Sequence, residues 1–284
     1  MESILAFLKS SVTIMIPVFF ASIGGMFAAL AGTLNIALEG LLLAGAFSSL
    51  TVFYFTGNIT FSILCAVISA VILCALQAFS VFKLRADMFI SGLAINLFSA
   101  GLCAVLSEKI FLTKGVVALD FLNENTLKTS MLFNLFIILG LILLLVSWVI
   151  IYKTPFGYRL RACHNDRDAL VSLGMKPHFY ITAAILISGF FCGLGGSFLS
   201  LNLSAYVPGM SAGKGWIALA VIFLGAKKPF GVLAACFVFA SAEAYSNYAQ
   251  GFWNVPADFM LAFPYICSLI ALIVVSFIPK KSVL

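Results

Sequence analysis

The hydropathy of this chain is organised in long, continuously apolar blocks and not in alternating apolar and polar positions. A helix needs about 20 apolar residues to cross the hydrocarbon core of a membrane, whereas alternation would mark the strands of an outer-membrane barrel. The blocks therefore predict about nine membrane-spanning helices. They cover residues 11–31, 36–55, 59–82, 88–107, 131–152, 179–201, 215–226, 230–249 and 259–278.

Composition supports the same fold class. The chain of 284 residues is 63% hydrophobic and 9% charged, and its mean hydropathy is +1.17, whereas soluble domains carry about 25% charged residues. We expect an all-α, polytopic membrane protein with a single transmembrane domain over residues 1–284. The apolar N-terminal stretch shows no obvious small-residue cleavage site, so we expect it to be retained as a helix.

Two sequence patterns occur twice in the same order. The octamer Gly25–Gly32 is similar to Gly189–Gly196, and the pentamer Ala86–Ile90 is similar to Ala257–Leu261. Glycine-spaced apolar octamers also match by chance, but a second pair at nearly the same separation argues against chance for both.

The positions of these copies predict inverted repeats. The two octamers belong to the first and sixth predicted helices, an odd offset, so the copies enter the membrane from opposite faces. The expected repeats are residues 11–107 and 179–279, with 131–152 as a connecting helix. Inverted repeats are typical of transporters, because two similar bundles can open a central site to either side in turn.

Basic residues predict the orientation in the membrane, because loops rich in Lys and Arg stay on the cytoplasmic side. One set of alternate loops holds Lys83, Arg85, Lys153, Arg159, Arg161, Arg167, Lys176, Lys227, Lys228, Lys280 and Lys281. The other set holds Lys9, Lys109, Lys114, Lys128 and Lys214. The first set is expected inside, with the N-terminus outside and the C-terminus inside. These loops explain the net charge of +6 without a nucleic-acid partner.

The sequence offers little chemistry of its own. Residues 209–215 resemble a phosphate-binding loop only loosely, because the spacing is wrong and Gly215 stands where Ser or Thr is needed. The seven cysteines form no C-x-x-C pair or Cys/His cluster and are expected to be small buried hydrophobes, so no metal or other cofactor is expected. No nucleophile, base or metal cluster supports an enzyme.

Two acidic residues lie within the predicted helices. Glu39 and Glu243 are candidates for ion coupling, since a charge inside a membrane usually faces a cavity or a partner. Proton-coupled carriers usually show more ionisable groups, so the sparsity favours an external energy source. A self-sufficient, ion-coupled secondary transporter that uses Glu39 and Glu243 remains the alternative from another class.

The longest cytoplasmic segment, residues 153–178, is the expected contact with that energy source. Asn165 is expected to cap a helix that runs through Asp168 and Ala169 to Gly174. A short, exposed helix of this kind, with Arg161 nearby, fits a groove of a partner protein. A solvated basic loop that only follows the charge rule is the alternative.

Four stretches resemble a known family. Residues 157–162 (Gly-Tyr-Arg-Leu-Arg-Ala), with Asn165, Ala169 and Gly174, resemble the coupling segment of bacterial ABC importer permeases. Residues 34–46 resemble the signature of the sugar, nucleoside and branched-chain amino acid permeases, in the Asn-Ile-x-Leu-Glu-Gly form typical of the nucleoside branch. Residues 208–220 are similar to that branch with Lys and Trp in place of Arg and Phe, and Pro264-Tyr265 resembles a pair in its last helix.

The resemblance implies the permease subunit of a type II ABC importer in the bacterial cytoplasmic membrane. It implies a second related permease, ATP-binding cassette subunits, an extracytoplasmic substrate-binding lipoprotein and surrounding membrane lipid as partners. The implied cargo is a nucleoside, with riboflavin or a simple sugar as alternatives. The residues expected to couple the permease to the ATPase are Gly157, Arg159, Arg161, Ala162, Asn165, Asp168, Ala169 and Gly174.

Four residues are candidates for the substrate pathway. Asn35 and Glu39 are four positions apart, so in a helix they share one face and offer an amide and a carboxylate. Asn96 is polar on an apolar helix, and Trp216 is expected near the outer mouth, where it can stack on a planar base. The structural alternatives are that Glu39 ties a broken helix to neighbouring backbone, that Asn96 joins helices, and that Trp216 is a membrane-interface residue. Glu243 is expected to pack against a helix or the partner permease.

Overall fold

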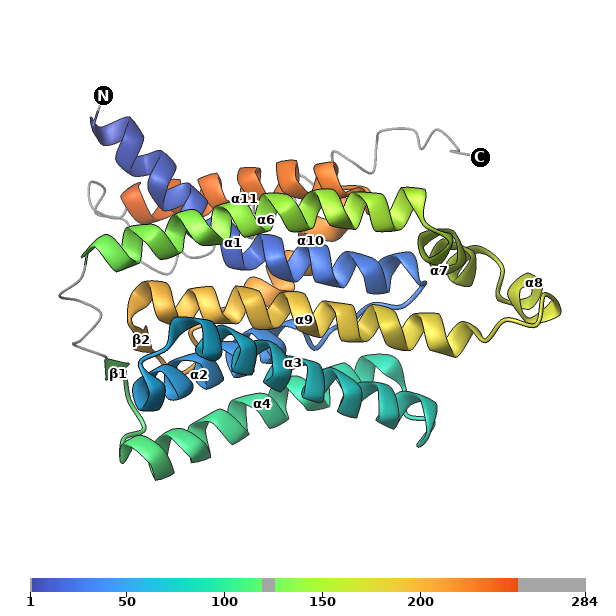
Figure 1. Cartoon of the computed structure of the whole chain (residues 1–284), viewed down its shortest axis with the longest axis horizontal. Coiled ribbons are helices and arrows are strands. Elements are labelled where there is room, and N and C mark those ends of the chain that lie inside the picture. The colour runs from blue at the N-terminus through green and yellow to red at the C-terminus, as the bar shows by residue number, and fades with distance from the viewer. Residues whose placement is uncertain (1, 119–125, 250–284) are drawn as a thin grey trace.

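A computed structural model describes residues 2–118 and 126–249 of the chain. It is a bundle of helices that run back and forth between two ends (Figure 1). The elements are α1 (Glu2–Leu30), α2 (Leu38–Thr56), α3 (Ile59–Phe82), α4 (Met88–Phe111), β1 (Val117–Ala118), α6 (Thr126–Lys153), α7 (Pro155–Asn165), α8 (Arg167–Ser172), α9 (Pro177–Leu203), β2 (Ala205–Tyr206), α10 (Lys214–Leu224) and α11 (Pro229–Ala249).

All predicted helices that fall within the described ranges are present, and the predicted helix 259–278 lies outside them. Seven helices of the described part are long and apolar enough to cross a membrane. α10 is not, because its 11 residues reach about 16 Å, half of a hydrocarbon core. The prediction of a crossing helix at 215–226 is therefore corrected to a half-helix.

Two helices begin inside the bundle and not at its ends. After α1, the chain turns at Gly32 beside His164 of α7 and runs back through residues 33–37 to the start of α2 (Figure 1). On the way, the side chain of Asn35 donates a hydrogen bond to Ser188, near the middle of α9. α10 follows a similar non-helical segment after β2, and its first turn contacts the first turn of α2 through Glu39.

The basic loops of the described residues gather at one end of the bundle. The turn before α4 lies at this end, close to the start of α9. Phe82, the last residue of α3, packs edge to face on His178 of α9, with ring centroids 5.0 Å apart. The turn between α10 and α11 approaches the same end, where Lys227 acts on His164. The arrangement agrees with the predicted cytoplasmic set. Lys214, which belongs to the other set and was predicted in an outer loop, lies within the bundle instead.

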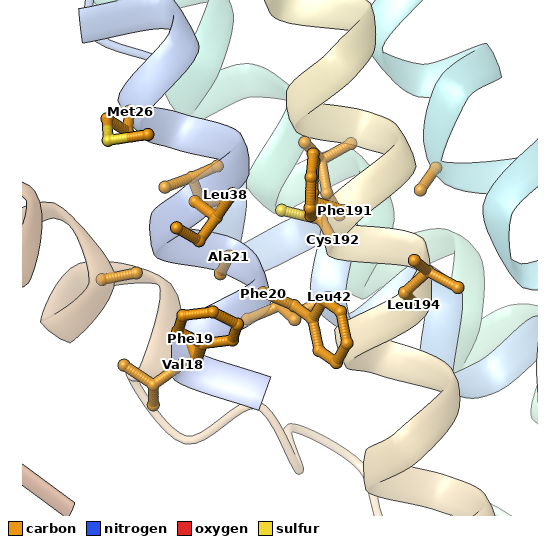
Figure 2. Packing of buried hydrophobic residues seen from close by; sticks show 14 of the residues in the cluster. Val18, Phe19, Phe20, Ala21, Met26, Leu38, Leu42, Phe191, Cys192 and Leu194 are labelled. Carbon is orange, nitrogen blue, oxygen red and sulfur yellow. The ribbon is translucent and has the colours of Figure 1, made fainter. Parts of the chain in front are cut away.

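α9 is the central helix and packs against α1, α2 and α3. Figure 2 shows side chains of α1 (Phe20), α2 (Leu42) and α9 (Phe191) meeting in the apolar core. The backbones of α1 and α9 approach closely at Gly24, which has no side chain. A Cβ atom on Gly24 would lie 2.7 Å from Cβ of Phe191. Small residues permit such approach between membrane helices, where dispersion contacts replace the hydrophobic effect.

The first and second halves have corresponding elements in opposite directions. α1 and α9, which carry the two similar octamers, run antiparallel (Figure 1), and each is followed by a helix that starts inside the bundle. Asp87 of the first pentamer caps α4, because its carboxylate accepts hydrogen bonds from the N–H groups of Phe89 and Ile90. The second pentamer lies outside the described residues, so the repeat boundaries stay a prediction.

A small strand pair joins the halves at the end opposite to the basic loops. β1 and β2 are antiparallel, with Val117 opposite Tyr206 and Ala118 opposite Ala205. The ring of Tyr206 packs edge to face on Phe47 of α2, with centroids 5.1 Å apart. This pair is an addition to the predicted all-helical fold and fixes where the segment before α10 begins.

Candidate functional site

Glu39 joins the first turns of α2 and α10. Its carboxylate accepts hydrogen bonds from the backbone N–H of Gly213 at 2.8 Å and of Gly215 at 2.7 Å. The first N–H groups of a helix have no partner within the helix and carry partial positive charge. A carboxylate therefore stabilises the start of α10 inside the bundle, where water is scarce.

An ion pair lies at the same helix terminus. Lys214 opens α10, and its Nζ is 3.7 Å from Oε1 of Glu243 on α11, with side chains only 14% and 23% exposed. A cation at a helix N-terminus is unfavourable, so the nearby carboxylates of Glu39 and Glu243 offset it. Sequence reasoning missed this pairing, because Lys214 was expected in an outer loop and Glu243 was considered alone.

The start of α2 is held by two asparagine side chains. Asn96 of α4 accepts a hydrogen bond from the N–H of Gly40 at 2.8 Å and donates one to the carbonyl oxygen of Ile36 at 2.9 Å. Asn35, fully buried, accepts from the N–H of Ala37 at 3.1 Å. Broken helices within a membrane require such substitutes, because unpaired backbone groups in hydrocarbon cost several kcal/mol each.

The structure thus brings together three of the four predicted pathway residues around the start of α2. Asn35 and Glu39 do not share a helix face as predicted, because Asn35 precedes α2: Asn35 bonds to α9, and Glu39 bonds to α10. Ser188, the partner of Asn35, gave no signal in the sequence, since a serine in an apolar helix is common.

Trp216 is placed deeper than predicted. It lies in the first turn of α10, one residue after Gly215, whose Cβ position would fall against Glu39. Its side chain is 44% exposed on the surface of the bundle. The predicted position at the outer mouth is corrected, because α10 starts inside the bundle after a non-helical segment that the apolar pattern did not reveal.

The predicted coupling segment forms two short helices that extend beyond the bundle (Figure 1). Thr154 caps the start of α7, because its hydroxyl accepts a hydrogen bond from the N–H of Gly157, and Pro155 is the first residue of the helix. Gly157 is buried against the end of α6, where a Cβ atom would overlap the carbonyl oxygens of Ile150 and Ile151. Only glycine fits this contact.

The two arginines of the motif lie on α7 with different partners. Arg159 donates a hydrogen bond from Nη1 to the hydroxyl of Tyr180 on α9 at 3.2 Å. The guanidinium of Arg161 lies over the rings of Tyr152 and Tyr158, at 5.2 and 4.9 Å from the centroids. Cation–π contacts of this kind orient an arginine without neutralising its charge.

The second short helix differs from its prediction at its start. Asn165 is the last residue of α7 and does not cap the next helix, because Asp166 is extended and α8 begins at Arg167. α8 contains Asp168 and Ala169 and ends before Gly174, which has a φ of +72° as predicted for a helix-terminating glycine. Val171 and Leu173 are 58% and 71% exposed. Ala162 is half-buried on α7.

The end of α7 holds two titratable groups. Burial raises the pKa of the Cys163 thiol, so it stays protonated and uncharged at neutral pH. The pKa of His164 is lowered, first by burial and then by the positive charges of Lys227 and Arg167. The imidazole is therefore neutral at the pH of the cytoplasm.

Replacing Gly157 by alanine is expected to separate α7 from the end of α6. The added methyl group overlaps backbone atoms that cannot rotate away, at a cost of about 1–3 kcal/mol. We expect uptake by the assembled transporter to fall strongly while the protein still reaches the membrane, as measured by radiolabelled uptake per unit of permease. Gly115→Ala is the control, because its nearest neighbour would be 3.5 Å away. Equal uptake by both variants would contradict the assignment of Gly157.

Two helices that start inside the bundle, together with a pair of short helices that extends beyond its basic end, define a polytopic membrane permease. Comparison with known proteins agrees. Residues 7–277 match the family described as branched-chain amino acid transport system / permease component, and the chain belongs to this family. It is a multi-pass protein of the bacterial cytoplasmic membrane.

Two relatives and one structure illustrate the family. The chain is 30% identical to the guanosine ABC transporter permease protein NupQ of Bacillus subtilis, over 90% of this chain and 87% of the relative. It is 29% identical to the nucleoside ABC transporter permease protein NupC of Lactococcus lactis, with the same coverage. The structure of PsaBC from Streptococcus pneumoniae in complex with Fab covers 97% of this chain and 92% of its own, with a TM-score of 0.57 at 13% identity, which shows a shared fold.

Proposed function

We propose that this chain is the membrane permease of an ABC importer that carries nucleosides into the cell. The observation that carries the proposal is the similarity over 90% of the chain to relatives named as guanosine and nucleoside permeases. The site adds support for an uncharged cargo, because Glu39 is bonded to the backbone of α10 and Lys214 is paired with Glu243. Riboflavin and simple sugars are the alternative cargoes.

The proposed partners follow from the two ends of the bundle. ATP hydrolysis is assigned to separate cassette subunits that contact α7 and α8, because Val171 of α8 and Leu173, which follows α8, are exposed beside basic side chains. A second, related permease is proposed to complete the translocation path, and an extracytoplasmic lipoprotein is proposed to deliver the cargo. The coupling residues predicted from sequence lie in α7, in α8 and at the glycine that follows α8.

The proposed path runs beside the first turn of α10. Trp216 offers a half-exposed aromatic face there, on which a nucleobase can stack, next to the contact between Glu39 and Gly215. Asn35, Asn96 and Glu39 support the path by fixing where α2 and α10 begin. Their polar atoms bond to the protein itself, so this role is one of positioning.

The test is uptake into cells with and without this gene, using radiolabelled adenosine, guanosine, uridine, riboflavin and ribose. ATP and the proton gradient are depleted separately. We expect nucleoside uptake that requires ATP and persists when an uncoupler collapses the gradient at constant ATP. ATP-dependent uptake of riboflavin or ribose alone would change the cargo.

The same experiment also tests the ion-coupled alternative. Glu39 and Glu243, its candidate residues, are engaged with α10 backbone and with Lys214 in this structure. A gradient-driven carrier would stop when the uncoupler is added and would tolerate loss of ATP. That outcome would overturn the assignment to an ABC importer.

A further inference from the structure

Three segments that are distant in sequence meet at the end of α7. Gly32, in the turn after α1, lies against His164: a Cβ atom on Gly32 would be 2.9 Å from Nδ1 and 3.1 Å from Cα of His164. The turn between α10 and α11 also approaches, since the charge of Lys227 acts on the imidazole, as does that of Arg167 from α8. His164 is therefore the point where the coupling helices, the return to α2 and the end of α10 converge.

α10 connects this point with Glu39. Its first turn is bonded to the Glu39 carboxylate, and its last turn leads directly to Lys227. The turn into α11 is tight, because a Cβ atom on Gly231 would overlap the carbonyl oxygen of Gly225. The 11 residues of α10 thus form a short helix, about 16 Å long, that connects the basic end of the bundle with its middle.

The return segment provides a second connection to the same place. Gly32 has a φ of +82° and leads through Asn35, which is anchored on α9, to the start of α2. Because Glu39 ties the first turn of α2 to the first turn of α10, the two connections are joined at their far ends. A displacement at His164 therefore acts on both α2 and α10.

We propose that His164 is a positioning residue through which movement of the coupling helices reaches α2 and α10 together. The inference rests on the proposed function as an ABC importer permease. α2 and α10 shift together, because His164 lies against the turn that precedes α2 and Glu39 ties the first turn of α2 to the first turn of α10. Disturbing His164 then uncouples ATP hydrolysis from transport without abolishing hydrolysis.

The test uses the whole importer, reconstituted in proteoliposomes with its ATPase and binding protein, and measures ATP hydrolysis and guanosine uptake side by side. His164→Lys places a permanent charge beside Lys227 and Arg167, whereas His164→Gln keeps a neutral polar side chain of similar size. We expect the lysine variant to carry at least about fivefold fewer guanosine molecules per ATP, the lower end of typical allosteric coupling. The glutamine variant should stay close to the unmodified protein.

Leu84→Lys is the matched control. Leu84 is exposed in the turn between α3 and α4 at the same end of the bundle, so this change adds a charge away from α7. If His164→Lys does not assemble, His164→Ala removes the imidazole, including the Nδ1 atom that faces Gly32, without adding charge and should show the same loss of transport per ATP. Hydrolysis and uptake that fall in parallel, or a ratio unchanged by every His164 variant, would overturn the proposal. An unmodified complex without ATP-dependent uptake would instead reject the proposed function.

Discussion

Replacing Glu39 by alanine is expected to abolish uptake and to destabilise the permease. The change leaves the N–H groups of Gly213 and Gly215 without their acceptor inside the bundle. Each buried donor without a partner costs about 1–3 kcal/mol, so the loss is about 2–6 kcal/mol. It also removes the negative charge that stabilises the start of α10 and the neighbouring cation of Lys214.

The measurements are uptake of radiolabelled nucleoside and the Tm of the purified protein in detergent. Glu39→Gln should lie between the unmodified protein and the alanine variant, because an amide offers one acceptor oxygen where the carboxylate offers two. Glu108→Ala is the matched control, since Glu108 pairs with Lys114 on the exposed surface and such pairs contribute little. Normal uptake by Glu39→Ala would show that α10 does not depend on this contact.

Replacing Gly196 by valine is expected to prevent α9 from packing on α2. Even a Cβ atom at this position would overlap the carbonyl oxygen of Leu42 and lie 2.8 Å from the N–H nitrogen of Ala46. Both are backbone atoms of α2, so the two helices must separate, at a cost of about 3 kcal/mol or more. We expect little folded protein, as measured by size-exclusion chromatography of detergent-solubilised membranes.

Gly101→Ala is the matched control for this prediction. Gly101 lies within α4, and nothing is within 4 Å of the position of an added Cβ atom. Alanine is the better helix former by about 0.8–1.0 kcal/mol, so this variant should be as stable as the unmodified protein or slightly more stable. If both variants fold equally well, the close approach of α9 and α2 is not a requirement of the fold.

The contrast between these two glycines shows how far sequence reasoning reaches. Both occur in apolar helices, and although Gly196 belongs to the repeated octamer, that pattern does not say which backbone it faces. The helices themselves were predictable, because a run of apolar residues of the right length has no better conformation in a membrane than a helix. Which glycine faces a neighbouring backbone depends on helix rotation, and that is set by packing.

For the candidate site, too, the sequence predicted the segments involved but not the contacts between them. The resemblance of residues 34–46 and 208–220 to one family drew attention to the two segments that meet at Glu39. The contact between these segments was not predicted, because Gly213 and Gly215 lie 174 and 176 positions after Glu39 in the sequence. Lys214 was misplaced for the same reason: in a count of loops it belongs outside, but its ion pair with Glu243 lies within the bundle.

Local sequence is enough to predict the class of molecule: a helical membrane protein of the permease family with its basic loops on one side of the membrane. These properties follow from local hydropathy, charge and motif, each of which is read within a short window. Three-dimensional packing is needed to see that α2 and α10 begin inside the bundle, that Glu39 holds α10, and that His164 lies against Gly32. Those features depend on hydrogen bonds and contacts between distant segments, which form only when α9 brings the helices together.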